Sequence, residues 1–175
     1  MKFKKTYLTA ACFLSLVFFG SNQCFAATTQ TLSLNATATI EAASLNASIQ
    51  NDLNFGTIIV SNQQSEVTID ASAGSATPVV TSGSASVTGG GSGLIHVTTN
   101  LDSNITITYP PSVTITDTGG VNTMTINSIA VNSTPSPLNA VSGTPNELHV
   151  GGMLTVDSLQ TADTYTGTVS ITVSY

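Results

Sequence analysis

The sequence has almost no positive charge. Its 175 residues include three Lys and no Arg, against nine Asp and Glu, and the lysines are Lys2, Lys4 and Lys5. Beyond Lys5, His96 and His149 are the only side chains that can become cationic. Because neutralising a nucleic acid's phosphates requires Lys or Arg, we expect no nucleic-acid partner. The same absence excludes a Schiff-base lysine and an arginine clamp.

Cysteine and aromatic residues are also scarce beyond the first 25 positions. Both cysteines, Cys12 and Cys24, and five of the six phenylalanines lie within the first 25 residues, and the sequence has no Trp. The rest of the chain cannot form a disulfide within itself. Its fold must therefore be held by packing and backbone hydrogen bonds.

The first 26 residues contain the three parts of a secretory signal peptide. Met1–Lys5 is basic, Tyr7–Phe19 is apolar, and the small residues Cys24 and Ala26 form a small-x-small site. The alternative, a transmembrane anchor, needs about 20 apolar residues, and this run is shorter. We predict a helical signal peptide cleaved after Ala26 or Ala27. The exported chain would have no membrane span and would be secreted, periplasmic or at the cell surface.

Beyond the signal, apolar and polar residues alternate in a pattern that predicts β-strands. Every second residue is apolar in Thr31–Ile40, Asn104–Tyr109 and Thr168–Tyr175. This period of two is typical of strands with one buried face. Shorter candidate strands lie at Leu53–Val60, Glu66–Asp70, Val79–Ser82, Leu94–Thr99, Val113–Thr116, Met124–Asn132 and Leu148–Val156.

About ten short strands separated by Gly- and Pro-rich turns predict an all-β fold, an antiparallel Ig-like or pilin-like β-sandwich. We expect residues 44–175 to form this domain and residues 27–43 to precede it as a strand or an extension. Helix is expected at most as one or two turns within Ala42–Asn51. Residues 72–93 are rich in Ser, Ala, Gly and Thr, which favours a loop or a weak edge hairpin.

No motif for catalysis or metal binding accompanies this pattern. The nine carboxylates are spread along the chain, and there is no calcium loop, no His pair at i and i+4 and no G-x-S-x-G elbow. His96 and His149 are each isolated within predicted strands. The remaining enzymatic alternative is a pair of distant carboxylates that converge as in glycoside hydrolases. We expect no enzymatic activity, no catalytic residue, no metal and no cofactor.

Four aromatic residues remain beyond the signal: Phe55, Tyr109, Tyr165 and Tyr175. Tyr109 and Tyr175 are in phase with the apolar residues of their strands, so we expect them in the core. A platform for a carbohydrate needs exposed rings, and these four residues provide few. A monomeric module that binds a glycan or a protein is therefore the second functional hypothesis.

Several short motifs resemble a family of secreted bacterial proteins of unknown function. They are N-F-G-x-I at Asn54–Ile58, V-G-G-x-L-x-V at Val150–Val156, and an ending from Gln160 to Tyr175 similar to Q-x-x-G-x-Y-x-G-x-x-x-V-x-V-x-Y. Asp163 departs from that ending, which usually has Gly there. The resemblance covers about Leu53 to Tyr175. It implies export and a β-sandwich, and it implies no catalytic residues.

The ending also looks like the last strand of chaperone–usher fimbrial subunits and of spore-coat-type pilins. In those proteins an alternating N-terminal extension adds a strand to the sheet of the neighbouring subunit. Thr31–Ile40 has a suitable length and pattern, and the alternative is that it is simply the first strand of its own sandwich. The leading hypothesis is a fimbrial or coat-like subunit whose partners are other copies of itself or a periplasmic chaperone and usher. The side chains expected to fill the neighbour's groove are Leu32, Leu34, Ala36, Ala38 and Ile40.

Overall fold

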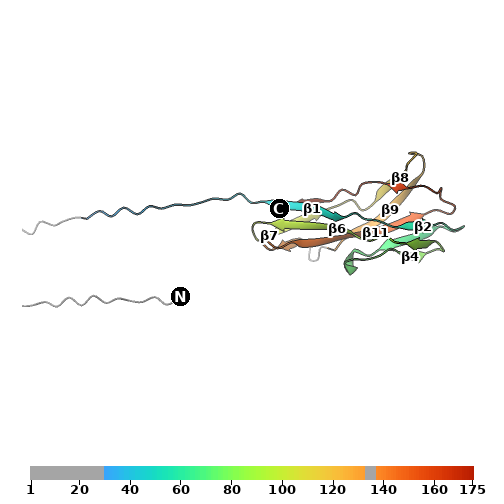
Figure 1. Ribbon diagram of the computed structural model, residues 1–175, viewed down its shortest axis with the longest axis horizontal. Coiled ribbons are helices and arrows are strands. Elements are labelled where there is room, and N and C mark those ends of the chain that lie inside the picture. The colour runs from blue at the N-terminus through green and yellow to red at the C-terminus, as the bar shows by residue number, and fades with distance from the viewer. Residues whose placement is uncertain (1–29, 133–136) are drawn as a thin grey trace, which may run out of the picture. The chain divides into compact units, whose positions relative to one another are not determined.

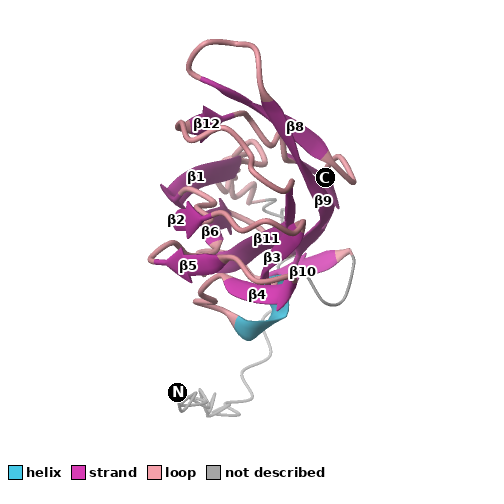
Figure 2. Ribbon diagram, turned by 90° about the vertical axis from the view of Figure 1, so that its right-hand side faces the viewer, coloured by secondary structure: helices cyan, strands magenta, loops and turns pink. Residues whose placement is uncertain are grey.

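The computed structural model describes residues 30–132 and 137–175. The expected signal peptide and its cleavage sites at Ala26 and Ala27 lie outside the described residues. The chain divides into two units, Met1–Thr39 and Ile40–Tyr175, and all the regular structure of the described residues lies in the second. That unit is all-β, with a single 3₁₀ turn, η1 (Ala71–Ala73) (Figures 1 and 2).

The described residues form thirteen strands, and every pairing between strands is antiparallel. The strands are β1 (Leu45–Asn51), β2 (Thr57–Ile59), β3 (Ser65–Ile69), β4 (Val79–Ser82), β5 (Ser86–Thr88), β6 (Gly93–Thr99), β7 (Ser103–Thr108), β8 (Val113–Asp117), β9 (Thr123–Val131), β10 (Leu138–Ala140), β11 (Asn146–Val156), β12 (Tyr165–Thr166) and β13 (Thr172–Ser174).

Strand β11 is the centre of the largest sheet, in which the strand order is β1-β6-β11-β9-β8-β12. Its first half, Asn146–Val150, pairs with β6. Its second half pairs with both β9 and β3, so these two strands lie on opposite edges of β11. Strand β3 also pairs with β4. Two smaller sheets have the orders β10-β7-β13 and β2-β5.

The core draws side chains from more than one sheet. Val67, Val97 and Leu148 of the large sheet and Ile105 of the three-stranded sheet are at most 1% exposed and belong to one apolar cluster. Burial of a Val, Leu or Ile side chain contributes about 1.5–3 kcal/mol. Contacts of this kind must stabilise the described unit, because it contains no cysteine.

The alternation of apolar residues predicted most of the central strands. In β3 and β7 the apolar residues at alternate positions are buried, namely Val67, Ile69, Ile105 and Ile107. The expected strand at Leu53–Val60 is shorter, because only β2 is regular there. Asn54 instead forms an isolated bridge with Gly91.

Two expectations for the tyrosines were wrong. Tyr109 is 38% exposed and Tyr175 is 52% exposed, so neither lies in the core. Each follows the last residue of its strand, β7 or β13. Pairing has stopped at these positions, so the period of two no longer dictates burial.

The N-terminal part of the described chain also differs from expectation. No strand is assigned between Gln30 and Ser44, so Thr31–Ile40 does not form the first strand of its own sheet. Ala42–Asn51, where the sequence allowed at most one or two helical turns, is mostly the strand β1. Residues 72–93, expected as a loop or a weak hairpin, contain the short strands β4 and β5.

Candidate assembly surface

The alternating segment ahead of the domain is fully exposed. Every residue from Gln30 to Ser44 is exposed, and the large apolar side chains Leu32, Leu34 and Ile40 are 82%, 95% and 94% exposed. Ala36 and Ala38, the smaller members of the same set, are exposed too. The segment therefore presents a row of apolar side chains that nothing in the described chain covers.

Strand β1 is an open edge of the large sheet. Among residues 30–132 and 137–175 it pairs with β6 alone, from Leu45 opposite Thr99 to Asn51 opposite Leu94. Its other edge has no strand partner among the described residues. An exposed row of backbone N–H and C=O groups can accept another strand.

The core-facing side of β1 is incompletely covered. Ser48 lies opposite His96, and His96 opposite Glu147, so these three polar residues share one face. Neighbouring residues on a strand point to opposite faces, which places Ile49 on the core side. Yet Ile49 is 70% exposed. Within the described residues, no strand or loop covers most of the Ile49 side chain on the core side of this edge.

The C-terminal segment is a second partly unpaired strand. Val169, Ile171 and Val173 are half-buried and pack against the core, whereas the Ser and Thr residues between them are mostly exposed. The expected alternation of Thr168–Tyr175 is therefore confirmed for these three residues. Only β13 pairs here, with β7, and residues 167–171 have no strand partner among the described residues.

Hydrogen bonds bring the start of β1 and the C-terminal segment together. The Tyr175 hydroxyl donates a hydrogen bond to the Ser44 carbonyl oxygen at a distance of 2.5 Å. The Asn100 side chain accepts a hydrogen bond from Ser44 N at 2.8 Å and donates one to the Ala42 carbonyl at 2.8 Å. Residues 42–44 are thereby held beside the end of β6. The two incompletely paired elements, β1 and the C-terminal segment, meet at this point.

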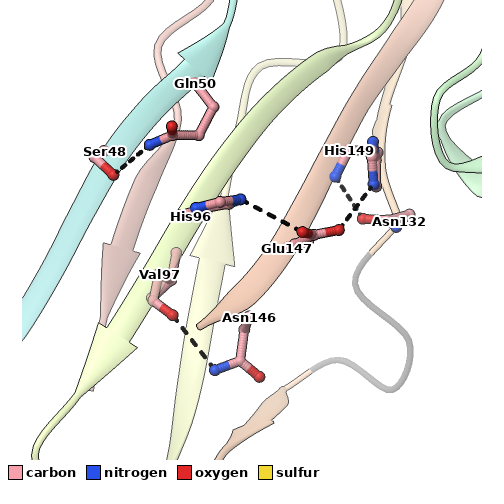
Figure 3. Close-up of polar contacts among 8 residues, drawn as sticks. All are labelled: Ser48, Gln50, His96, Val97, Asn132, Asn146, Glu147 and His149. Atoms are coloured by element: carbon pink, nitrogen blue, oxygen red, sulfur yellow. Dashed lines mark hydrogen bonds and ion pairs between the residues drawn. The ribbon is translucent and has the colours of Figure 1, made fainter. Parts of the chain in front are cut away.

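The histidines lie on the polar face of β6 and β11, where His96 is opposite Ser48 of β1 (Figure 3). His96 Nε2 is 3.5 Å from Glu147 Oε1, and His149 Nε2 is 3.7 Å from Glu147 Oε2. Glu147 is well exposed, so each ion pair contributes at most about 1 kcal/mol when the imidazole is protonated. The only side chains beyond Lys5 that can become cationic thus meet at one carboxylate. No charged residue lies in β1 or in residues 167–175.

The rest of the described surface gives little support to other sites. No group of three or more His, Cys, Asp or Glu residues that could hold a metal occurs in residues 30–132 and 137–175. A hollow of about 730 Å³ opens over β3, β4 and η1 and has no aromatic side chain in its lining. No helix within the described residues is long and apolar enough to cross a membrane.

Of the aromatic side chains, Phe55 is buried in the core. The Tyr165 hydroxyl is engaged within the fold: it donates to the Thr161 carbonyl at 2.8 Å and accepts from Gln160 Nε2 at 2.9 Å. These two rings therefore serve packing and internal hydrogen bonding, rather than offering a free face to a sugar.

Asp117 stabilises the turn between β8 and β9. Its carboxylate accepts hydrogen bonds from the Asn122 side chain at 2.6 Å and from Val121 N at 2.7 Å. These bonds favour the ionised form and lower the pKa of Asp117, the Asn122 bond most, although partial burial opposes the shift. The carboxylate serves the fold, and no second carboxylate is hydrogen-bonded or paired with it.

A family model for a domain of unknown function, DUF4402, matches residues 44–175. The chain belongs to this family. The DUF4402 domain begins at Ser44, one residue before β1, so Leu32, Leu34, Ala36, Ala38 and Ile40 all lie ahead of it. Comparison with curated proteins and with solved structures finds no match.

Sequence reasoning identified the exposed segment and missed the residues at the open edge. It predicted no strand where β1 lies and allowed at most a turn or two of helix there, in a segment rich in Ser and Asn. The one available signal was Leu45, Ala47 and Ile49 at alternate positions. Pairing of that segment with β6 cannot be deduced from so weak a pattern.

Proposed function

We propose that this protein is an exported, non-enzymatic structural protein, a fimbrial or coat-like subunit of the cell surface that assembles by β-strand addition. The observation that carries the proposal is the exposed, alternating segment from Thr31 to Ile40, which lies just ahead of the DUF4402 domain. Strand addition gains affinity from main-chain hydrogen bonds and specificity from alternate side chains. The segment offers an unpaired main chain and exposed apolar side chains at alternate positions.

The energetics of such an addition are favourable. Leu32, Leu34 and Ile40 are more than four-fifths exposed, and burial of each contributes about 1.5–3 kcal/mol. Main-chain hydrogen bonds add about 0.5–1.5 kcal/mol each. The segment carries no charge, so no unpaired charge would have to be buried.

The domain would act as a rigid β-sandwich. A core shared between the large sheet and the three-stranded sheet supports this arrangement, since a sandwich buries the inner faces of two sheets against each other. The expected signal peptide at residues 1–26 supports export to the periplasm or the cell surface. Before assembly, the exposed apolar segment would need protection, which a periplasmic chaperone and usher can supply.

Deletion of Thr31–Ile40 tests the proposal. It removes the alternating segment and spares Ala42 and Ser44, whose hydrogen bonds to Asn100 hold the start of β1. The unaltered exported protein should be multimeric by native sizing, and the shortened protein should be a folded monomer with an unchanged circular dichroism spectrum. A monomeric unaltered protein, or a shortened one that still assembles, would refute the proposal.

A further inference from the structure

We infer that β1 and the C-terminal segment together form the acceptor site for the added strand, and that the occupant is Thr31–Ile40 of a second copy of this chain. The inference rests on the proposed assembly by strand addition and adds where the strand binds and which segment supplies it. Three features of the described residues support it: two incomplete strand edges, uncovered apolar side chains, and a matching free segment.

The first feature is the geometry of the two edges. Within the part of the chain that the structure describes, strand β1 pairs only with β6, and β13 pairs only with β7. The bond from the Tyr175 hydroxyl to the Ser44 carbonyl joins the start of β1 to the end of the C-terminal segment. The chain therefore leaves this contact along β1 and arrives at it along the C-terminal segment. A strand added here could form main-chain hydrogen bonds with either element or with both.

The second feature is the apolar surface at these edges. Ile49 faces the core side of β1 but is 70% exposed, and Val169, Ile171 and Val173 are only half-buried. Natural sheets usually cover or interrupt such edges. Here no proline, lysine or other charged residue protects either one.

The third feature is the match with the free segment. Ten residues of extended chain span about 33 Å, and the seven residues of β1 span about 23 Å, so Thr31–Ile40 is long enough to cover the edge. Its alternate residues are apolar, as the uncovered core face requires. Neither the segment nor the acceptor elements carry a charge, so the two surfaces are compatible.

The start of β1 argues that a second copy supplies the strand. To lie against its own β1, the segment would have to turn back within residues 41–44. Ser44 and Ala42 are instead held beside β6 by three hydrogen bonds to Asn100, one to its backbone and two to its side chain. A tight turn would break these bonds, whereas a strand from another copy leaves them intact.

Disulfide trapping in the full-length chain, expressed with its own leader, tests the acceptor site. Because no native cysteine follows Cys24, cysteines can be placed on the polar side of the segment at Asn35, Thr37 or Thr39. Each is combined with Ser48→Cys on β1 or Ser170→Cys in the C-terminal segment. The matched control replaces the acceptor cysteine with Val121→Cys, which is 80% exposed in the β8–β9 turn. Single-cysteine variants and the unsubstituted chain give the background.

The acceptor site predicts a ladder of disulfide-linked copies, removed by reductant, for at least one Ser48 or Ser170 pair and not for the Val121 pairs. A linked single chain would identify the chain's own segment as the occupant and overturn the inference. Multimeric native material without any such ladder, or with equal trapping at Val121, would overturn this acceptor site while leaving the proposed function standing. Monomeric native material from the unsubstituted chain would refute the proposed function and the inference with it.

Discussion

The hydroxyl of Tyr175 donates a hydrogen bond to the carbonyl oxygen of Ser44, 131 positions earlier in the sequence. This contact joins the residue before β1 to the residue after β13. It therefore links the edge of the large sheet to an edge of the three-stranded sheet. An assembly surface built from both edges depends on this relationship.

Tyr175→Phe removes that hydrogen bond and keeps the ring. Because one hydrogen bond makes a net contribution of about 0.5–1.5 kcal/mol, the free energy of unfolding in urea should fall by about 1 kcal/mol with an unchanged m-value. Tyr109→Phe is the matched control, since Tyr109 is also partly exposed and follows a strand. Equal stability of the Tyr175→Phe variant and the native protein would show that the contact contributes nothing.

Gly151→Ala should destabilise the fold strongly. A Cβ at Gly151 would lie 2.2 Å from the Ile69 carbonyl oxygen and 2.7 Å from Ala71 N, both of which are backbone atoms. Relieving this overlap would disturb the junction of β11 and β3, at a cost of roughly 3 kcal/mol. Thermal unfolding measures the effect, with Gly119→Ala as the control because a Cβ there meets nothing closer than 3.9 Å. Similar melting temperatures for the two variants would contradict the packing described.

Asp117→Asn should lower stability in a pH-dependent way. The folded-state pKa of Asp117 is lowered, so its ionised form contributes stability that is complete above the unfolded value of about 3.9. That contribution is lost as the pH falls through the folded-state pKa. The difference in melting temperature between the native protein and the variant should therefore be largest at neutral pH and shrink as the pH falls below 4. A difference that stays constant from pH 7 to pH 2 would contradict the assignment.

Ile49→Asp should prevent assembly without unfolding the subunit. Ile49 is 70% exposed, so the stability of the monomer should change by no more than about 0.5 kcal/mol. A buried charge at the added strand's interface would be costly. Ile59→Asp is the matched control, because Ile59 is 67% exposed but lies on β2. Native sizing should show monomers for Ile49→Asp only, and assembly of both variants would argue against the open edge as the binding site.

The central strands could be predicted from the sequence because each has one buried face. Val67 and Ile69, like Ile105 and Ile107, alternate with polar residues, and the pleat turns this alternation directly into burial. Strand β1 could not be predicted in this way. Its residues beyond Leu45 are exposed, so the strand owes its existence to pairing with β6, about 50 positions away.

The same distinction applies to the candidate site. The proposed donor residues Leu32, Leu34 and Ile40 lie within one ten-residue stretch of sequence, so their period of two identified them. The proposed acceptor site is instead defined by the open edges of β1 and of the C-terminal segment in the described chain, and by the hydrogen bond between Tyr175 and Ser44, which are far apart in sequence. Local sequence carries no signal for either property, and only the arrangement of the strands reveals them.

The most direct test of strand addition is to replace Leu34 or its neighbour Ser33 by Asp and to measure the native size of the protein. Leu34→Asp places a charge on the apolar side of the segment, and Ser33→Asp places the same charge on the polar side. Both positions precede the DUF4402 domain, so the melting temperature of the domain should not change. We expect multimers from the native protein and from Ser33→Asp, and folded monomers from Leu34→Asp. A native protein that is already monomeric, or a Leu34→Asp variant that assembles as the native protein does, would contradict the proposal.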